Sequence, residues 1–254
     1  MTIIQLSDLH IGGDYDGQYN TRYTFEKTVK AVGKYLDSLP DKQPRGIVVS
    51  GDVSDDVQNM AENYKYVDRL LHGVIRQHDN IVYMTGNHDN ARIMGETLGF
   101  DPDEMSMFTT PAANILIIPT YKGEVELSKM VLDLYGDYDG TYQDDLPLLA
   151  FSHFPIGRVQ NRFMYSIGGA LKNTEAIAKC LHKFGVNDFF CGHFHSPGTT
   201  VHDGYRIHVA PSTQCQIDPW AKKFQGVGDY PGFTVITVED KKVNVEFKFV
   251  ELGD

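Results

Sequence analysis

Aspartate, histidine and asparagine residues recur in five short motifs along this sequence. In order, the motifs are Asp8-Leu9-His10, Gly51-Asp52, Gly86-Asn87-His88-Asp89, His153-Phe154-Pro155 and Gly192-His193-Phe194-His195. Their carboxylate, imidazole and amide groups are borderline-to-hard metal ligands, and the motifs contain no thiolate. Such a set suits manganese, iron or zinc better than an ion that selects thiolates. The motifs therefore predict a metal site.

The number of candidate ligands indicates more than one ion. Seven side chains could ligate a metal: Asp8, His10, Asp52, Asn87, His153, His193 and His195. Seven ligands are too many for one tetrahedral zinc ion, but they suffice for two ions that share a carboxylate. Two ions about 3.5–4 Å apart can clamp a phosphoryl group and activate water at neutral pH. We expect a pair of divalent or trivalent ions, Mn²⁺ or Fe²⁺/Fe³⁺ before Zn²⁺, and hydrolysis of a phosphoester.

Each motif on its own also has an ordinary explanation. Asp-x-His and Gly-Asp occur in many turns, and Gly-Asn-His-Asp could be a turn whose glycine and asparagine tolerate positive φ. The two imidazoles of Gly-His-x-His could simply form hydrogen bonds. All five motifs in this order, each directly after an apolar run, favour one functional site over five unrelated turns.

The hydrophobic pattern predicts elements that would bring the motifs together. Predicted strands cover Thr2–Leu6, Gly46–Ser50, Ile81–Thr85, Ile115–Ile118, Leu146–Phe151 and Asn187–Cys191, and predicted helices cover Thr21–Leu39, Asn59–His78 and Asn173–Phe184. Later strands are expected at Thr199–His202, Tyr205–Ala210, Gly232–Val238 and Val243–Val250, the last two forming a hairpin. Loops after the carboxyl ends of strands in an open α/β sheet converge on one crevice. The motifs should therefore meet there.

Composition limits the remaining possibilities. The 254 residues suit one large domain, and we expect a single domain over residues 1–254. The net charge is −11, with no stripe of lysine and arginine, so we do not expect binding to nucleic acid. The three cysteines do not suggest a disulfide framework, and no apolar run approaches the ~18 residues of a membrane span. We expect a cytoplasmic protein without a membrane partner, and the sequence is compatible with a dimer.

The ordered series of motifs resembles the calcineurin-like metallophosphoesterase superfamily from Asp8 to His195. The resemblance implies an α/β fold arranged as a four-layer α/β/β/α sandwich. It also implies two metal sites that share Asp52: one with Asp8, His10 and His195, the other with Asn87, His153 and His193. His88 matches a family histidine that is not a ligand but lies near the leaving-group oxygen, so it is the candidate catalytic residue.

A narrower resemblance extends toward the C-terminus. Ala210-Pro211-Ser212-Thr213, with Asn20-Thr21 and Tyr64, is similar to class III cyclic-nucleotide phosphodiesterases, including bacterial cAMP phosphodiesterases. It implies a small phosphodiester substrate and hydrolysis of 3′,5′-cAMP to 5′-AMP. The alternatives are a general phosphodiesterase or phosphatase, a nuclease with the same metal site, and a non-enzymatic scaffold. The acidic charge and the absence of a capping domain argue against the nuclease, and the filled ligand positions argue against the scaffold.

Some segments depart from the family pattern or have no clear counterpart in it. Phe154 stands where many of these enzymes have the second histidine of His-His-Pro. The ligand His153 is kept, but the substrate contacts beside it are expected to differ. Residues Asp101–Tyr142 match poorly, and we expect them to shape the mouth of the site. Trp220 is expected to pack under a loop rather than to stack on a base. Asp-Tyr-Asp-Gly occurs at 14–17 and 137–140 and predicts two solvated turns.

Overall fold

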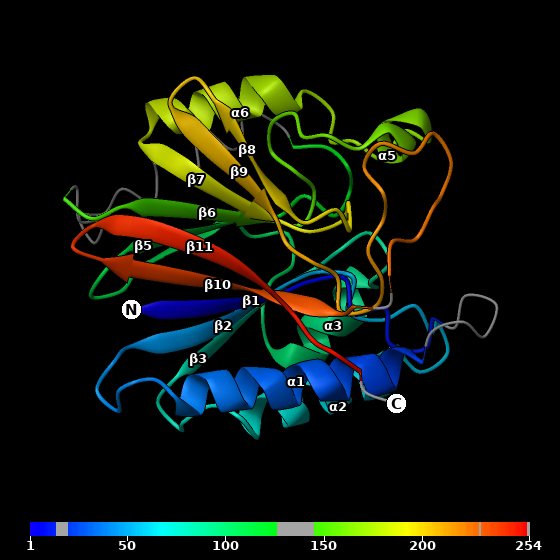
Figure 1. Ribbon diagram of the computed structural model, residues 1–254, viewed down its shortest axis with the longest axis vertical. Helices are drawn as coiled ribbons and strands as arrows, with labels where there is room; N and C mark the ends of the chain where they lie inside the picture. Colours follow the sequence, from blue (N-terminus) through cyan, green and yellow to red (C-terminus); the bar gives the residue numbers. More distant parts are fainter. Residues whose placement is uncertain (14–19, 126–144, 229, 253–254) are drawn as a thin grey trace.

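Two β-sheets pack face to face in the computed structural model, which describes residues 1–13, 20–125, 145–228 and 230–252 (Figure 1). The first sheet has the order β11-β10-β1-β2-β3 and comprises β1 (Thr2–Leu6), β2 (Arg45–Ser50), β3 (Asn80–Met84), β10 (Gly232–Glu239) and β11 (Lys242–Phe249). The second has the order β4-β5-β6-β7-β9-β8 and comprises β4 (Ser106–Thr109), β5 (Asn114–Ile118), β6 (Leu148–Ser152), β7 (Val186–Cys191), β8 (Gly198–His202) and β9 (Tyr205–Val209). Both Asp-Tyr-Asp-Gly copies, and positions 126–142 of the poorly matching segment, lie outside the described residues.

Helices cover the outer faces of both sheets. In Figure 1, α1 (Thr21–Asp37) and α2 (Met60–His72) lie against the first sheet, and α6 (Thr174–Lys183) lies against the second. Two short helices, α3 (Ala91–Leu98) and α5 (Arg162–Ser166), follow loops that carry motifs or their neighbours. The predicted four-layer α/β/β/α sandwich is confirmed.

Alternating side chains explain why the central strands can be apolar throughout. On β1, Ile3 points into the layer between the sheets, whereas Ile4 points toward the helices. On β6, Phe151 belongs to the same layer between the sheets, and Ala150 packs toward α6. A strand that is covered on both faces needs apolar residues at every position, which is typical of parallel strands between layers. Because the two sheets share this core layer, we propose that residues 1–254 form one domain.

The parallel strands direct the motifs to one edge. β1, β2 and β3 are parallel in the first sheet, and β5, β6, β7 and β9 are parallel in the second. Each motif begins within three residues after a strand of this parallel set: β1, β2, β3, β6 and β7. The sequence-based expectation of a shared crevice therefore follows from the topology.

Local signals explain where some elements begin and end. Asn20 caps α1 by accepting a hydrogen bond from the backbone N–H of Tyr23. The helix predicted to reach His78 ends at His72, where Gly73 follows as the C-cap. The predicted hairpin turns at Asp240 and Lys241, whose φ values of 49° and 64° are those of a two-residue type I′ turn.

Among the residues that the structure describes, no helix is both long and apolar enough to cross a membrane.

Candidate metal centre

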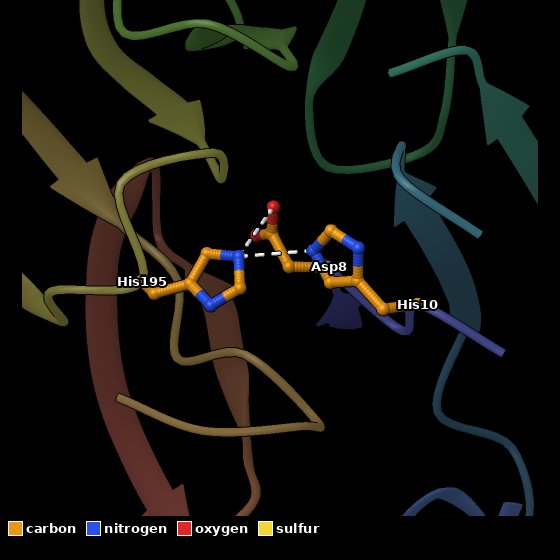
Figure 2. A group of neighbouring side chains, drawn as sticks. All are labelled: Asp8, His10 and His195. Carbon is orange, nitrogen blue, oxygen red and sulfur yellow. Dashed lines mark hydrogen bonds and ion pairs between the residues drawn. The ribbon is translucent and has the colours of Figure 1, made fainter. Parts of the chain in front are cut away.

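Six of the predicted ligands form two clusters of buried side chains. Asp8, His10 and His195 make up the first cluster, and Asp52, His153 and His193 make up the second. Within each cluster the potential ligand atoms lie within 4.8 Å of one another. Figure 2 shows how Asp8 and His10, from the loop after β1, and His195, from the loop after β7, converge. The structure thus brings together residues that are up to 187 positions apart in the sequence.

The remaining predicted ligand, Asn87, lies beside the second cluster, and the Asp52 carboxylate lies between the two clusters. Asn87 Oδ1 lies 3.0 Å from His153 Nε2. Asp52 Oδ2 lies 3.3 Å from His153 Nε2 and 3.8 Å from His10 Nε2, so it faces both clusters. All seven predicted ligands therefore lie in one place, with the Asp52 carboxylate between the two groups.

Five of these residues adopt a left-handed backbone conformation. Their φ values lie between 48° and 64°: Asp8, His10, Asp52, His193 and His195. Such a conformation costs roughly 1–3 kcal/mol for a residue other than glycine and persists only where its surroundings enforce it. Here the Asp8 N–H donates to Gly51 O at 3.0 Å, and the His193 N–H donates to Asp8 Oδ1 at 2.9 Å. The loops therefore hold one another in the shape that directs these side chains inward.

Two motif glycines are required by close approach to the carboxylates. A Cβ on Gly192 would lie 1.8 Å from Ser7 Oγ and 2.5 Å from Asp8 Oδ2. A Cβ on Gly86 would lie 2.1 Å from Asp52 Oδ1. The glycines of Gly-Asn-His-Asp and Gly-His-x-His thus make room for the acidic side chains.

Each of the four histidines uses one ring nitrogen outside the cluster. The acceptors lie at 2.8–3.0 Å and are Asp55 Oδ1 for His10, Ser50 O for His153, Gly169 O for His193 and Cys215 O for His195. With the ring hydrogens assigned to these acceptors, the other nitrogen of each ring offers a lone pair to the site. Oriented imidazoles of this kind are characteristic of metal ligands. The Nε2 atoms of His10 and His195 lie 3.1 Å apart, close enough for both to bind one cation.

The buried acids and imidazoles strongly influence one another. Burial opposes the ionisation of Asp8, but His195 and His153 outweigh it and lower the pKa of Asp8 to about 2. Burial likewise opposes ionisation of Asp52, yet His153 and His10 hold its pKa well below the usual range. Burial lowers the pKa of His153, but Asp52 and Asp8 raise it to about 9. Two ionised carboxylates at the centre make this a site that favours cations.

Comparison with known families identifies this arrangement. A profile of the calcineurin-like phosphoesterases matches residues 1–197. The chain belongs to the calcineurin-like phosphoesterase family. The resemblance inferred from the five motifs is confirmed, and membership implies a hydrolase of phosphoesters.

Individual relatives of this phosphoesterase are distant. A Fibrobacter succinogenes protein named "Probable cyclic nucleotide phosphodiesterase" is 27% identical over 242 residues, covering 86% of this chain and 82% of that protein. The 3′,5′-cyclic adenosine monophosphate phosphodiesterase CpdA of Vibrio vulnificus is 23% identical over 255 residues, covering 93% and 85%. The structure of a dimetal phosphatase from Danio rerio superimposes with a TM-score of 0.64 at 11% identity, covering 100% and 97%. This likeness establishes the shared fold.

Three residues around the phosphoesterase site have contacts that sequence analysis missed. Asp55 accepts hydrogen bonds from Nδ1 of His10 at 2.8 Å and of His88 at 2.9 Å. The bond from His88 to Asp55 raises the pKa of His88 to about 9. Ser212 Oγ donates to the backbone oxygen of Asp8 at 2.8 Å. Asp89 accepts the N–H groups of Val53 and Ser54 in the loop after β2 and of Gly86 in its own loop. The position of Asp55, three residues after Asp52, is the one local signal that could have indicated its role.

The site opens into a cavity of about 620 Å³. His88 and most of the predicted ligands line it, and the remaining wall is largely apolar apart from Lys122, Lys172 and Gln214. Phe154, the departure from His-His-Pro, is buried, and its ring lies over His193 with centroids 3.9 Å apart. Trp220 does not line this cavity and is 67% exposed, so the prediction that it packs under a loop is wrong.

The contact of Gly192 with Ser7 and Asp8 leads to a prediction. Gly192→Ala must displace this loop, and overpacking of this kind costs about 1–3 kcal/mol. We expect a lower free energy of unfolding and at least about tenfold weaker Mn²⁺ binding, measured by urea unfolding and calorimetric titration. Gly198→Ala is the matched control, because its Cβ would meet nothing within 4 Å. Wild-type stability and Mn²⁺ affinity in Gly192→Ala would contradict the role of this glycine.

Proposed function

We propose that this phosphoesterase uses two metal ions to hydrolyse 3′,5′-cAMP to 5′-AMP. The proposal of two ions rests on the Asp52 carboxylate, which lies between the two clusters and faces both of them. One ion would be held by Asp8, His10, Asp52 and His195, and the other by Asp52, Asn87, His153 and His193. This donor set of carboxylates, imidazoles and one amide oxygen suits Mn²⁺ or iron, and Zn²⁺ is compatible with it.

The side chains around the ions have complementary tasks. When bound, the ions would supply Lewis-acid stabilisation of the phosphoryl oxygens and a lowered pKa for the attacking water. Asn87 directs Oδ1 toward the second site, which leaves its Nδ2–H group to donate to a phosphoryl oxygen. The outer hydrogen bonds of the four histidines fix the orientation of their rings and keep the site ready for substrate.

His88 is the proposed proton donor to the leaving oxygen. It lines the cavity, and its side chain is 39% exposed. Asp55 fixes Nδ1 at 2.9 Å, so Nε2 is the ring nitrogen that can reach substrate. A positioned group of this kind can protonate a departing alkoxide.

Charge, cavity size and the named relatives support this substrate class. Two relatives bear the names of cyclic nucleotide phosphodiesterases, and they align over most of this chain. A net charge of −11 repels polyanions such as DNA over a Debye length of about 8 Å, but it affects a small monoanion less. The cavity of about 620 Å³ is larger than a phosphoryl group needs, and it falls among pockets of roughly 300–1,000 Å³ that bind small organic ligands.

The proposed role of His88 predicts a dependence on the leaving group. We expect His88→Ala to retain its metal and to lose about 10²–10⁴-fold in kcat for cAMP. The loss should be smaller for bis-p-nitrophenyl phosphate, whose leaving group needs no proton. Metal analysis and steady-state kinetics on both substrates measure this, with the exposed His78→Ala as control. Loss of metal, or equal losses on the two substrates, would contradict proton donation by His88.

Product analysis tests the substrate proposal. We expect the Mn²⁺-loaded enzyme to convert 3′,5′-cAMP to 5′-AMP and to leave duplex DNA intact even at low salt. Chromatography after incubation with each substrate at matched metal and salt separates the outcomes. Rapid cleavage of DNA without AMP formation would favour a nuclease. Turnover of nitrophenyl esters alone would leave a general phosphodiesterase or phosphatase.

A further inference from the structure

Part of the apolar cavity wall is built from two segments that are far apart in the sequence. Phe163 belongs to α5, Ile167 follows that helix, and Phe224 comes from the loop before β10. In Figure 1 this loop, drawn in orange, runs beside α5. The rings of Phe163 and Phe224 meet edge to face, with centroids 5.9 Å apart and an angle of 73°.

Two of these side chains are more exposed than the fold requires. Phe224 is 56% exposed and Ile167 is 60% exposed, although both line a concave surface. Their apolar area therefore contributes little to the core, and an apolar or aromatic ligand in the cavity would cover it.

The apolar wall extends to the proposed ligands. Phe154 lines the same cavity, and its ring lies against His193 at a centroid distance of 3.9 Å. A molecule whose phosphate is held by the ligands therefore meets aromatic surface directly beside its phosphate. Gly168 and Gly169 form part of the same wall and have no side chains that would fill the space.

We propose that this wall is a nucleobase subsite in which Phe224 stacks against the base of a nucleotide and the nearly perpendicular ring of Phe163 borders the edge of that base. The inference rests on the proposed function, because the base is the planar group that a cyclic nucleotide would place beside its phosphate. The exposed ring of Phe224 suits a π-face better than a flexible alkyl chain, and stacking contributes about 1–3 kcal/mol per base. The subsite makes nucleotides the preferred class among small phosphoesters.

The test compares two ligands that differ only in the base. Calorimetric titration of the Mn²⁺-loaded protein with 5′-AMP and with ribose 5-phosphate gives the affinity ratio that is due to adenine. We expect AMP to bind about 5- to 150-fold more tightly to the wild type. Phe224→Ala should bring the ratio close to one by weakening AMP alone, and Phe224→Trp should retain it. Trp220→Ala is the control, because this exposed aromatic residue of the same loop does not line the cavity.

Three results would overturn the subsite. The first is that AMP binds no more tightly than ribose 5-phosphate, or does not bind at all. The second is that the affinity ratio is unchanged in Phe224→Ala. The third is that n-hexyl phosphate binds more tightly than AMP and that its binding depends on Phe224. The last result would indicate an alkyl phosphoester instead. The titration needs no turnover. If AMP binds more tightly than ribose 5-phosphate but cAMP is not hydrolysed, only the substrate proposal is overturned. Hydrolysis of cAMP with a ratio of one overturns only the subsite.

Discussion

The buried Asp52 residue connects loops that come from both sheets. Its backbone oxygen accepts the N–H groups of Leu9 at 2.8 Å and His10 at 2.9 Å. Its Oδ1 accepts the N–H of His88 at 2.9 Å, and its Oδ2 lies 3.3 Å from His153 Nε2. A buried carboxylate costs several kcal/mol unless hydrogen bonds or positive charge compensate it. The loops after β1, β2, β3 and β6 therefore stabilise this one group together, and none of them can shift alone without a cost.

Packing between the sheets sets the distance across which these loops meet. Phe151 and Phe190 stack in the layer between the sheets, with centroids 4.9 Å apart. Phe151 stands two residues before His153, and Phe190 three residues before His193, so this apolar contact lies directly below the ligands of the second sheet. The site is thus preorganised by three features together: the apolar packing between the sheets, the left-handed loop residues and the outer hydrogen bonds of the histidines.

The motifs and the central strands could be predicted because their signals are local. Runs such as Ile115–Ile118 are apolar at successive positions, and each predicted ligand stands within four residues after a strand. The short helices α3 and α5 were missed, since helices of 8 and 5 residues have little periodicity and depend on tertiary packing. The place of Phe224 in the cavity wall could not be predicted from the sequence either. It lies in the polar stretch Lys222–Gln225 and reaches the cavity only because the fold brings that loop to α5.

Anomalous diffraction from crystals grown with Mn²⁺, recorded near the manganese absorption edge, tests whether two ions bind on either side of Asp52. We expect two anomalous peaks about 3.5–4 Å apart with the carboxylate of Asp52 between them. A single peak, or two peaks that do not share Asp52, would contradict it.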